Sequence, residues 1–132
     1  MARTEKPGLI HLDTHIVCWL YEARVDLLSE PARAAIERGR LFVSPIIDLE
    51  LQYLHEIGRI NKGPSAVLSA LSAEIGLALD PQPLEKIVSR ARDLHWTRDP
   101  FDRLIVASAL LAGGRLVTKD TLIRKHCKAA LW

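Results

Sequence analysis

Short apolar runs alternate along the chain with longer stretches in which apolar residues recur every three to four positions. The short runs predict strands at residues 8–13, 41–44, 77–80, 115–118 and 129–132. The longer stretches predict helices at residues 14–23, 29–40, 46–60, 65–76, 81–96, 101–114 and 119–127. The alternation predicts an α/β fold, in which a central, mostly parallel sheet of four to five short strands is flanked by helices on both faces.

Capping and turn residues mark the ends of several predicted helices. Thr14 is the expected cap of the first helix, and Ser29, followed by Pro31, begins the second. Gly39 marks the end of that second helix. Asp99 precedes a proline, and its side chain can accept hydrogen bonds from the free N–H groups of the next turn.

The composition is that of a folded globular chain. Its 132 residues can enclose a core, and 48% apolar with 26% charged residues is ordinary for such a domain. Aromatic residues make up only 5%, so the core is expected to consist of Leu, Ile, Val and Ala. We therefore expect a single domain over residues 1–132, with residues 1–7 as a loose polar lead-in.

The cysteines and the lengths of the apolar runs indicate the cellular compartment of the protein. Cys18 and Cys127 give neither a disulfide framework nor a zinc spacing, and Cys18 is expected to be a buried free thiol. No segment has the roughly 18 apolar residues of a membrane span, and the start lacks the apolar region of a signal peptide. We expect a soluble cytoplasmic protein that makes no membrane contact. Its net charge of +2 is compatible with a polyanionic partner.

Four acidic residues lie where a predicted strand passes into a helix, or just inside that helix. This acidic quartet consists of Asp13, Glu50, Asp102 and Asp120. Ligands of parallel sheets bind beyond the carboxyl ends of the strands, so we expect the quartet to meet at that edge. Carboxylates gathered there repel one another unless a cation neutralises them, and such oxygen ligands suit Mg²⁺ or Mn²⁺. The pattern therefore points to phosphoryl-transfer chemistry.

A structural explanation competes at each position, because acids near helix starts often only cap the helix. This explanation suits Asp99 well. Asp48 and Glu50 are two residues apart on a helix, so they point about 200° apart and Asp48 is not an expected ligand. Asp13 ends an apolar strand and Asp102 precedes a buried run, where an unpaired charge is costly. Four such positions at one edge favour a metal site over capping alone.

The quartet lies in the segments LDTHIVCWL, SPIIDLEL, RDPFDRLIVASALL and LVTKD, with Trp132 following. In this order they resemble the PIN-domain family, and more narrowly the VapC-type toxins of bacterial toxin–antitoxin pairs. The match covers nearly the whole chain. The most specific part is DPFDRLIVASA, with the acid of LVTKD 18 residues after Asp102. One departure is Asp48, where family members more often have a small polar residue.

The resemblance implies that the quartet is the catalytic set of a nuclease. It implies a supporting position for Asp99. It also implies that the Thr118 hydroxyl bonds a carboxylate or a metal-bound water. For Arg103 two roles stay open, pairing with a neighbouring carboxylate or with an RNA phosphate.

The resulting hypothesis is an endoribonuclease that hydrolyses phosphodiester bonds with a water activated by Mg²⁺ or Mn²⁺. Asp13 and Asp102 would hold the principal ion, and Asp120 would complete its ligands directly or through water. Glu50 would orient the attacking water or help a second ion, about 3.5–4 Å from the first in two-metal sites. The products would carry 3′-hydroxyl and 5′-phosphate ends. The sequence shows no pattern for a covalent route, and its histidines are too isolated for a zinc site.

The resemblance also implies partners: structured RNA such as tRNA or ribosomal RNA, and a cognate antitoxin. The apolar helix faces make a homodimer a further expectation. The residues expected to guide RNA are Arg98, Lys119, Arg124 and Lys125, among a wider group of Arg59, Lys62, Arg90, Arg92, Arg103 and Lys128. No aromatic platform for stacking bases is evident in the sequence. The apolar faces at residues 46–60 and 64–75 are either core or surfaces for the antitoxin or a second copy.

Three alternatives remain open at this point. One is a housekeeping PIN nuclease of RNA processing that has no antitoxin. Another is a catalytically silent domain that binds RNA or protein, which the complete quartet argues against. The third is a flavodoxin-like phosphatase or receiver domain, which would need an acid pair after the first strand where this chain has Asp13 alone.

Overall fold

The computed structural model describes residues 8–132, so the predicted lead-in at residues 1–7 lies outside it. The strands are β1 (Leu9–Leu12), β2 (Arg40–Val43), β3 (Ala78–Leu79), β4 (Arg115–Val117) and β5 (Ala130–Leu131). The helices are α1 (Thr14–Tyr21), α2 (Glu30–Arg38), α3 (Ile46–Glu56), α4 (Pro64–Ile75), α5 (Leu84–Ala91), α6 (Pro100–Ala112) and α7 (Thr121–His126). A short 3₁₀ helix, Val25–Leu27, follows α1.

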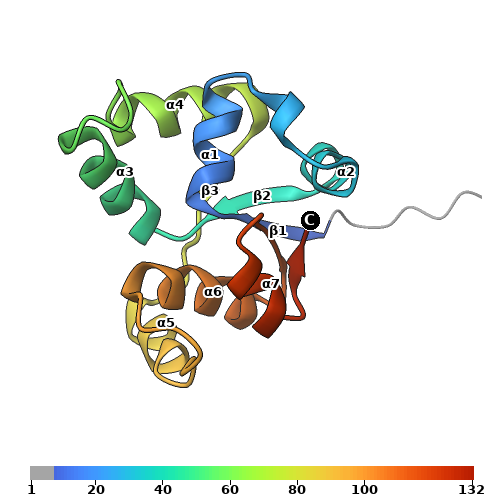
Figure 1. Cartoon of the computed structure of the whole chain (residues 1–132), viewed down its shortest axis with the longest axis vertical. Coiled ribbons are helices and arrows are strands. Elements are labelled where there is room, and N and C mark those ends of the chain that lie inside the picture. The colour runs from blue at the N-terminus through green and yellow to red at the C-terminus, as the bar shows by residue number, and fades with distance from the viewer. Residues whose placement is uncertain (1–7) are drawn as a thin grey trace, which may run out of the picture.

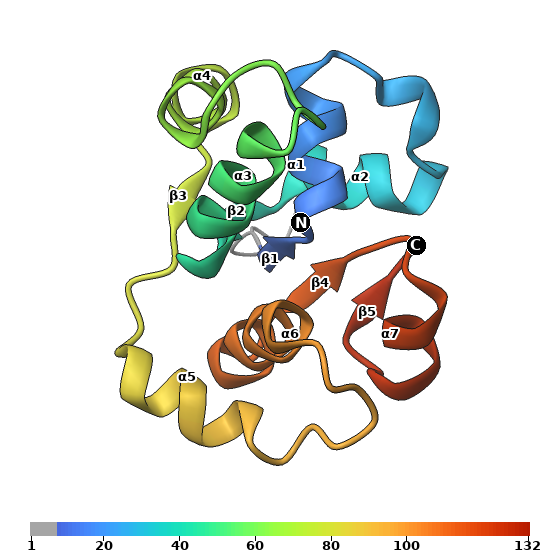
Figure 2. The same cartoon turned by 60° about the vertical axis from the view of Figure 1, so that its left-hand side comes forward.

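All five strands form one sheet in the order β3-β2-β1-β4-β5, and every neighbouring pair is parallel. Helices α1 to α4 lie on one side of the sheet, and α5 and α6 lie on the other, with α7 beside β5 (Figure 1, Figure 2). The chain winds outward from β1 to β3, crosses to the other face, and continues through β4 to β5. The predicted α/β fold with a central parallel sheet is confirmed.

The core is aliphatic, as predicted. The buried apolar side chains are Leu, Ile, Val and Ala, together with Cys127. The middle strand β1 is covered on both faces, which explains why Ile10, His11 and Leu12 are all buried. Gly39, after α2, packs so tightly on β1 that a Cβ would lie 2.2 Å from Cγ1 of Ile10. Cys18 is half-buried, so its predicted full burial is wrong. None of the helices among residues 8–132 is long and apolar enough to cross a membrane.

Several helices are shorter than their patterns predict. Helix α3 ends at Glu56 because Gly58 takes a left-handed φ of 78°. Helix α5 begins only after Pro83, whose ψ of 132° is not helical, and ends at Ala91. The chain then turns, so that Leu94 enters the core. The pattern also does not predict the 3₁₀ helix.

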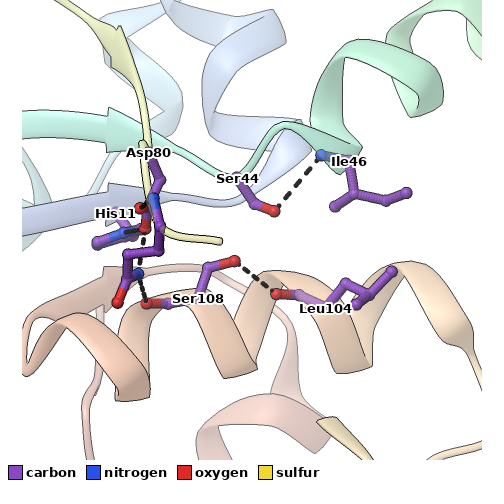
Figure 3. Close-up of polar contacts among 7 residues, drawn as sticks. His11, Ser44, Ile46, Asp80, Leu104 and Ser108 are labelled. Carbon is purple, nitrogen blue, oxygen red and sulfur yellow. Dashed lines mark hydrogen bonds and ion pairs between the residues drawn. The ribbon is translucent and has the colours of Figure 1, made fainter. Parts of the chain in front are cut away.

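A buried polar network ties the segment between β3 and α5 to strand β1 and to helix α6 (Figure 3). Asp80 follows β3, and one of its carboxylate oxygens lies 2.7 Å from Nε2 of His11 on β1. The Gln82 backbone N–H and side-chain amide both donate to Asp80, at 2.8 and 2.6 Å. The same amide donates to the carbonyl of Ser108 in α6 at 3.0 Å. This network fixes the crossing of the chain to the face where α6 lies.

Candidate active site

Two members of the quartet lie at the carboxyl ends of neighbouring strands, at the edge where the sequence predicts them. Asp13 follows β1, and Asp120 lies three residues after β4. The parallel register places Leu12 beside Val117. The Asp13 N–H donates to the Val117 carbonyl at 3.1 Å, which continues this pairing beyond β1.

Asp13 is 5% exposed and both of its carboxylate oxygens are held by the protein. One accepts a hydrogen bond from the Thr14 N–H at 2.8 Å, so Asp13 is the cap of α1. The prediction that Thr14 caps this helix is therefore wrong, because the Thr14 hydroxyl bonds Glu50 instead. The other oxygen accepts from the Thr118 hydroxyl at 2.6 Å. Burial raises the pKa of Asp13 above its ordinary value, and the Thr118 bond offsets part of that rise.

Thr118 connects the two acids at the strand ends. It is fully buried, and besides donating to Asp13 its hydroxyl accepts from the Asp120 N–H at 3.0 Å. Asp120 in turn caps α7, with one carboxylate oxygen accepting from the Ile123 N–H at 3.0 Å. A single hydroxyl thus fixes the position of one acid and the backbone of the other.

Glu50 reaches the site from α3, in its second turn and not in the first turn that the sequence predicts. The Thr14 hydroxyl donates to its carboxylate. Burial raises the pKa of Glu50, the Thr14 bond lowers it, and the charges of Asp13 and Asp99 raise it further. Glu50 is therefore a half-buried carboxyl inside an acidic neighbourhood.

Asp102 lies in the first turn of α6. Asp99 caps this helix as predicted, accepting from the N–H groups of Phe101 at 2.8 Å and of Asp102 at 3.3 Å. Burial is the largest cause that raises the pKa of Asp102 to about 7, and the charges of Asp99 and of the other three quartet members follow. The structure therefore gathers all four predicted acids into one negatively charged cluster, with Asp99 at its border.

The chemistry of this cluster fits a hard divalent cation, because its donors are carboxylate and hydroxyl oxygens. Burial and, after it, four neighbouring carboxylates raise the pKa of Asp102, and a bound cation would compensate both effects. Within residues 8–132, however, no three His, Cys, Asp or Glu side chains are arranged so that they could hold a metal ion. The four carboxylates therefore influence one another electrostatically without surrounding a common point.

The remaining predicted positions lie around this cluster. The Arg103 Nε donates to the Thr97 carbonyl at 2.8 Å and holds the loop before α6, and its two predicted roles stay predictions. Asp48 is exposed and lines a separate pocket between α3 and α4. The four residues expected to guide RNA are all exposed: Arg98, Lys119, Arg124 and Lys125.

Sequence reasoning missed two residues that lie beside the quartet. His15 and Trp19 of α1 line a pocket of about 380 Å³ together with Lys119, Asp120 and Thr121. The Trp19 ring lies 6.2 Å from the ring of Trp132, measured between centroids. Aromatic side chains therefore do gather next to the site, contrary to the expectation from sequence. The only signal in the sequence is the four-residue spacing of His15 and Trp19, which places them on one helix face.

Comparison with known proteins identifies the family. The model of the PIN domain matches residues 10–129. Ribonuclease VapC22 of Mycobacterium tuberculosis is 38% identical over 118 residues, which cover 87% of this chain and 89% of that protein. The structure of VapBC2 from Rickettsia felis bound to a promoter DNA fragment matches with a TM-score of 0.65 at 15% identity, covering 93% of this chain and 96% of its own. The VapBC-1 structure from nontypeable Haemophilus influenzae matches with a TM-score of 0.57 at 18% identity, covering 94% and 96%. This chain belongs to the PIN-domain family and, within it, to the VapC group.

Proposed function

We propose that this protein is a Mg²⁺- or Mn²⁺-dependent endoribonuclease, the toxin of a toxin–antitoxin pair, and that it cuts structured RNA such as tRNA or ribosomal RNA. The observation that carries the proposal is the cluster around Asp102, whose pKa burial and four neighbouring carboxylates raise to about 7. Such a cluster is suited to a divalent cation, and the relative VapC22 bears the name of a ribonuclease.

In this proposal the quartet divides two tasks, holding the metal and orienting the attacking water. Asp13, Asp102 and Asp120 would hold the metal, which when bound would lower the pKa of a water and neutralise charge on the phosphate oxygens. The Thr118 hydroxyl keeps Asp13 oriented through its 2.6 Å bond. The Thr14 hydroxyl orients Glu50, whose carboxylate would accept a hydrogen bond from the attacking water. The fragments would end in a 3′-hydroxyl and a 5′-phosphate.

Cleavage of total cellular RNA tests the proposal. Purified wild-type protein is incubated with the RNA in Mg²⁺ or Mn²⁺, and in EDTA. The Asp102→Asn variant is incubated with the RNA in the same metal ions. The matched control is Asp48→Asn, which removes an exposed acid outside the cluster. We expect discrete cuts by the wild type and the control, and none in EDTA or with Asp102→Asn. Cuts that persist in EDTA, or fragments with 2′,3′-cyclic phosphate ends, would contradict the mechanism.

The antitoxin part of the proposal rests on membership of the VapC group and needs its own test. A cognate antitoxin is expected to be encoded beside this chain and to cover the acidic cluster. The product of the neighbouring gene is expected to co-purify with this protein. Added in equal amount, it is expected to stop cleavage. Full activity in its presence would instead indicate a housekeeping nuclease.

A further inference from the structure

Three aromatic side chains from distant parts of the sequence meet beside Asp120. His15 and Trp19 lie one turn apart on α1, with ring centroids 6.3 Å apart, and Trp19 lies 6.2 Å from Trp132. Trp132 directly follows β5, which pairs with β4 at the edge of the sheet. We refer to these three residues as the aromatic row. Pairing between β4 and β5 fixes its far end relative to the quartet.

Two open pockets follow the aromatic row. The pocket of about 380 Å³ contains His15, Trp19, Lys119, Asp120 and Thr121. The second, of about 530 Å³, is lined by Thr121, Arg124, Lys125, Ala130, Leu131 and Trp132. Thr121 belongs to both pockets, so they adjoin there, and together they extend from Asp120 past the aromatic row to Arg124 and Lys125. We refer to these two adjoining pockets as the path.

The charges along this path change sign within a short distance. Lys119, Arg124 and Lys125 are exposed, and no ion pair found among residues 8–132 uses them. The quartet by itself repels a phosphate backbone, so an RNA strand needs cations just beyond the acids. Sites for single-stranded nucleic acid combine such cations with aromatic faces on which bases stack. The path has both components.

We propose that the aromatic row binds an unpaired base of the RNA beside the bond that the quartet cuts. Lys119 would hold the phosphate of that nucleotide, and Arg124 with Lys125 would hold the strand farther out. In a duplex the bases stack on one another and are not free to bind a protein ring. The substrate class is therefore RNA that is cut within a single-stranded segment such as a loop. This inference rests on the proposed function for its cutting step.

Tryptophan fluorescence measures contact with the aromatic row without any cleavage. The protein is titrated in EDTA with a short oligouridine. Trp96 provides a matched control, because it stacks on His126 at 5.4 Å and is not part of the aromatic row. We expect the oligonucleotide to quench the wild type and Trp96→Phe alike. Trp132→Ala is expected to lose most of the quenching and to bind roughly 5- to 150-fold more weakly, the range for loss of one stacked base.

Cleavage of two RNAs of the same sequence tests the substrate class. In one RNA the cut site lies in a hairpin loop, and in the other a complementary strand pairs it. We expect the loop to be cut and the paired form to be spared. Trp132→Ala and His15→Ala are expected to lower kcat/KM on the loop, while Trp96→Phe is unchanged. His15 is exposed, so its substitution tests the aromatic row without disturbing the core.

The outcomes separate this inference from the proposed function. If the wild type cuts RNA while Trp132→Ala and His15→Ala bind and cut like Trp96→Phe, the inference is wrong and the nuclease stands. Equal cutting of loop and duplex also overturns it, as does a Trp132→Ala variant that loses only antitoxin binding. If the wild type cuts nothing but oligouridine still quenches through Trp132, the aromatic row binds RNA and the proposed nuclease fails.

Discussion

Three carboxyls of the quartet have pKa values that burial raises: Asp13, Glu50 and Asp102. A carboxyl with a raised pKa holds its proton more firmly in the folded than in the unfolded state. The carboxyl therefore contributes fully to stability at a pH below its pKa in the unfolded protein. This contribution is lost as the pH rises through its pKa in the folded protein. For Asp102, whose pKa rises from 3.8 to about 7, the loss falls between those two values.

The metal-free protein is therefore expected to be less stable at pH 8 than at pH 5, and Mg²⁺ is expected to restore stability at pH 8. The reason is that protons at low pH and the cation at high pH both relieve the cost of burying carboxylate charge, together with the repulsion between neighbouring carboxylates. Thermal denaturation in EDTA and in Mg²⁺ at both pH values measures this, with Asp48→Asn expected to behave like the wild type. A Tm that rises from pH 5 to pH 8 in EDTA would contradict it.

Thr118 is expected to matter more than its small size implies, because its hydroxyl serves Asp13 and Asp120 together. Thr118→Val keeps the shape but leaves both partners unsatisfied. We expect a loss of about 1–3 kcal/mol in the free energy of unfolding, together with weaker nuclease activity. Thr118→Ser keeps the hydroxyl and is expected to stay close to the wild type in both. Urea denaturation measures the stability of both variants, and RNA cleavage measures their activity. If Thr118→Val and Thr118→Ser have the same stability and activity, the hydroxyl does not have this role.

Among the elements, the segment between β3 and α5 joins helix α6 to strand β1 of the sheet. Asp80→Ala would remove the acceptor for His11 and for Gln82 at a buried position. We expect a loss of about 1–3 kcal/mol, the scale for leaving a buried hydrogen-bond partner unsatisfied, and faster amide exchange in α6. Asp93→Ala, at an exposed acid near the end of α5, is the control. Urea denaturation and hydrogen exchange provide the measurements. If Asp80→Ala lowers the free energy of unfolding no more than the control does, Asp80 does not hold these elements together.

Periodicity predicts the five strands, the seven α-helices and the edge where the acids gather, because these follow from the local pattern and the rule for parallel sheets, but it does not predict the 3₁₀ helix or all helix ends. The cap by Asp99 was also predictable, since it acts within a few residues. The partner of His11 lies 69 residues away, and the aromatic row joins residues from both ends of the chain. Such pairs depend on tertiary packing, which one sequence does not reveal. Thr14 illustrates the same limit, because its hydroxyl leaves the local cap for Glu50, 36 residues away.

At the scale of the whole molecule, the outer face of α3 is apolar and uncovered. Leu49, Tyr53 and Ile57 follow one another at four-residue intervals and are each at least half exposed. In α4, by contrast, Val67 and Leu71 are buried in the core. The sequence analysis left open whether the apolar faces at residues 46–60 and 64–75 belong to the core or to an interaction surface. Much of the α4 face belongs to the core, but this stripe on α3 does not.

A second copy of the chain is expected to cover the stripe at high concentration, since burial of apolar surface drives association. Analytical ultracentrifugation is expected to show a dimer for the wild type and a monomer for Tyr53→Asp. Val25→Asp, at an exposed apolar residue outside the stripe, is the control and should still dimerise. A wild type that stays monomeric at all concentrations would contradict the expectation.

The bond between Thr118 and Asp13 joins residues 105 positions apart. During translation at roughly 5–20 residues per second, about 5–20 seconds separate the synthesis of these two residues. Before β4 has emerged and paired with β1, Asp13 lacks the hydroxyl that orients it and Asp120 has no place at the sheet. During synthesis, the acidic residues of the nascent chain therefore do not form the site until Thr118 has emerged from the ribosome.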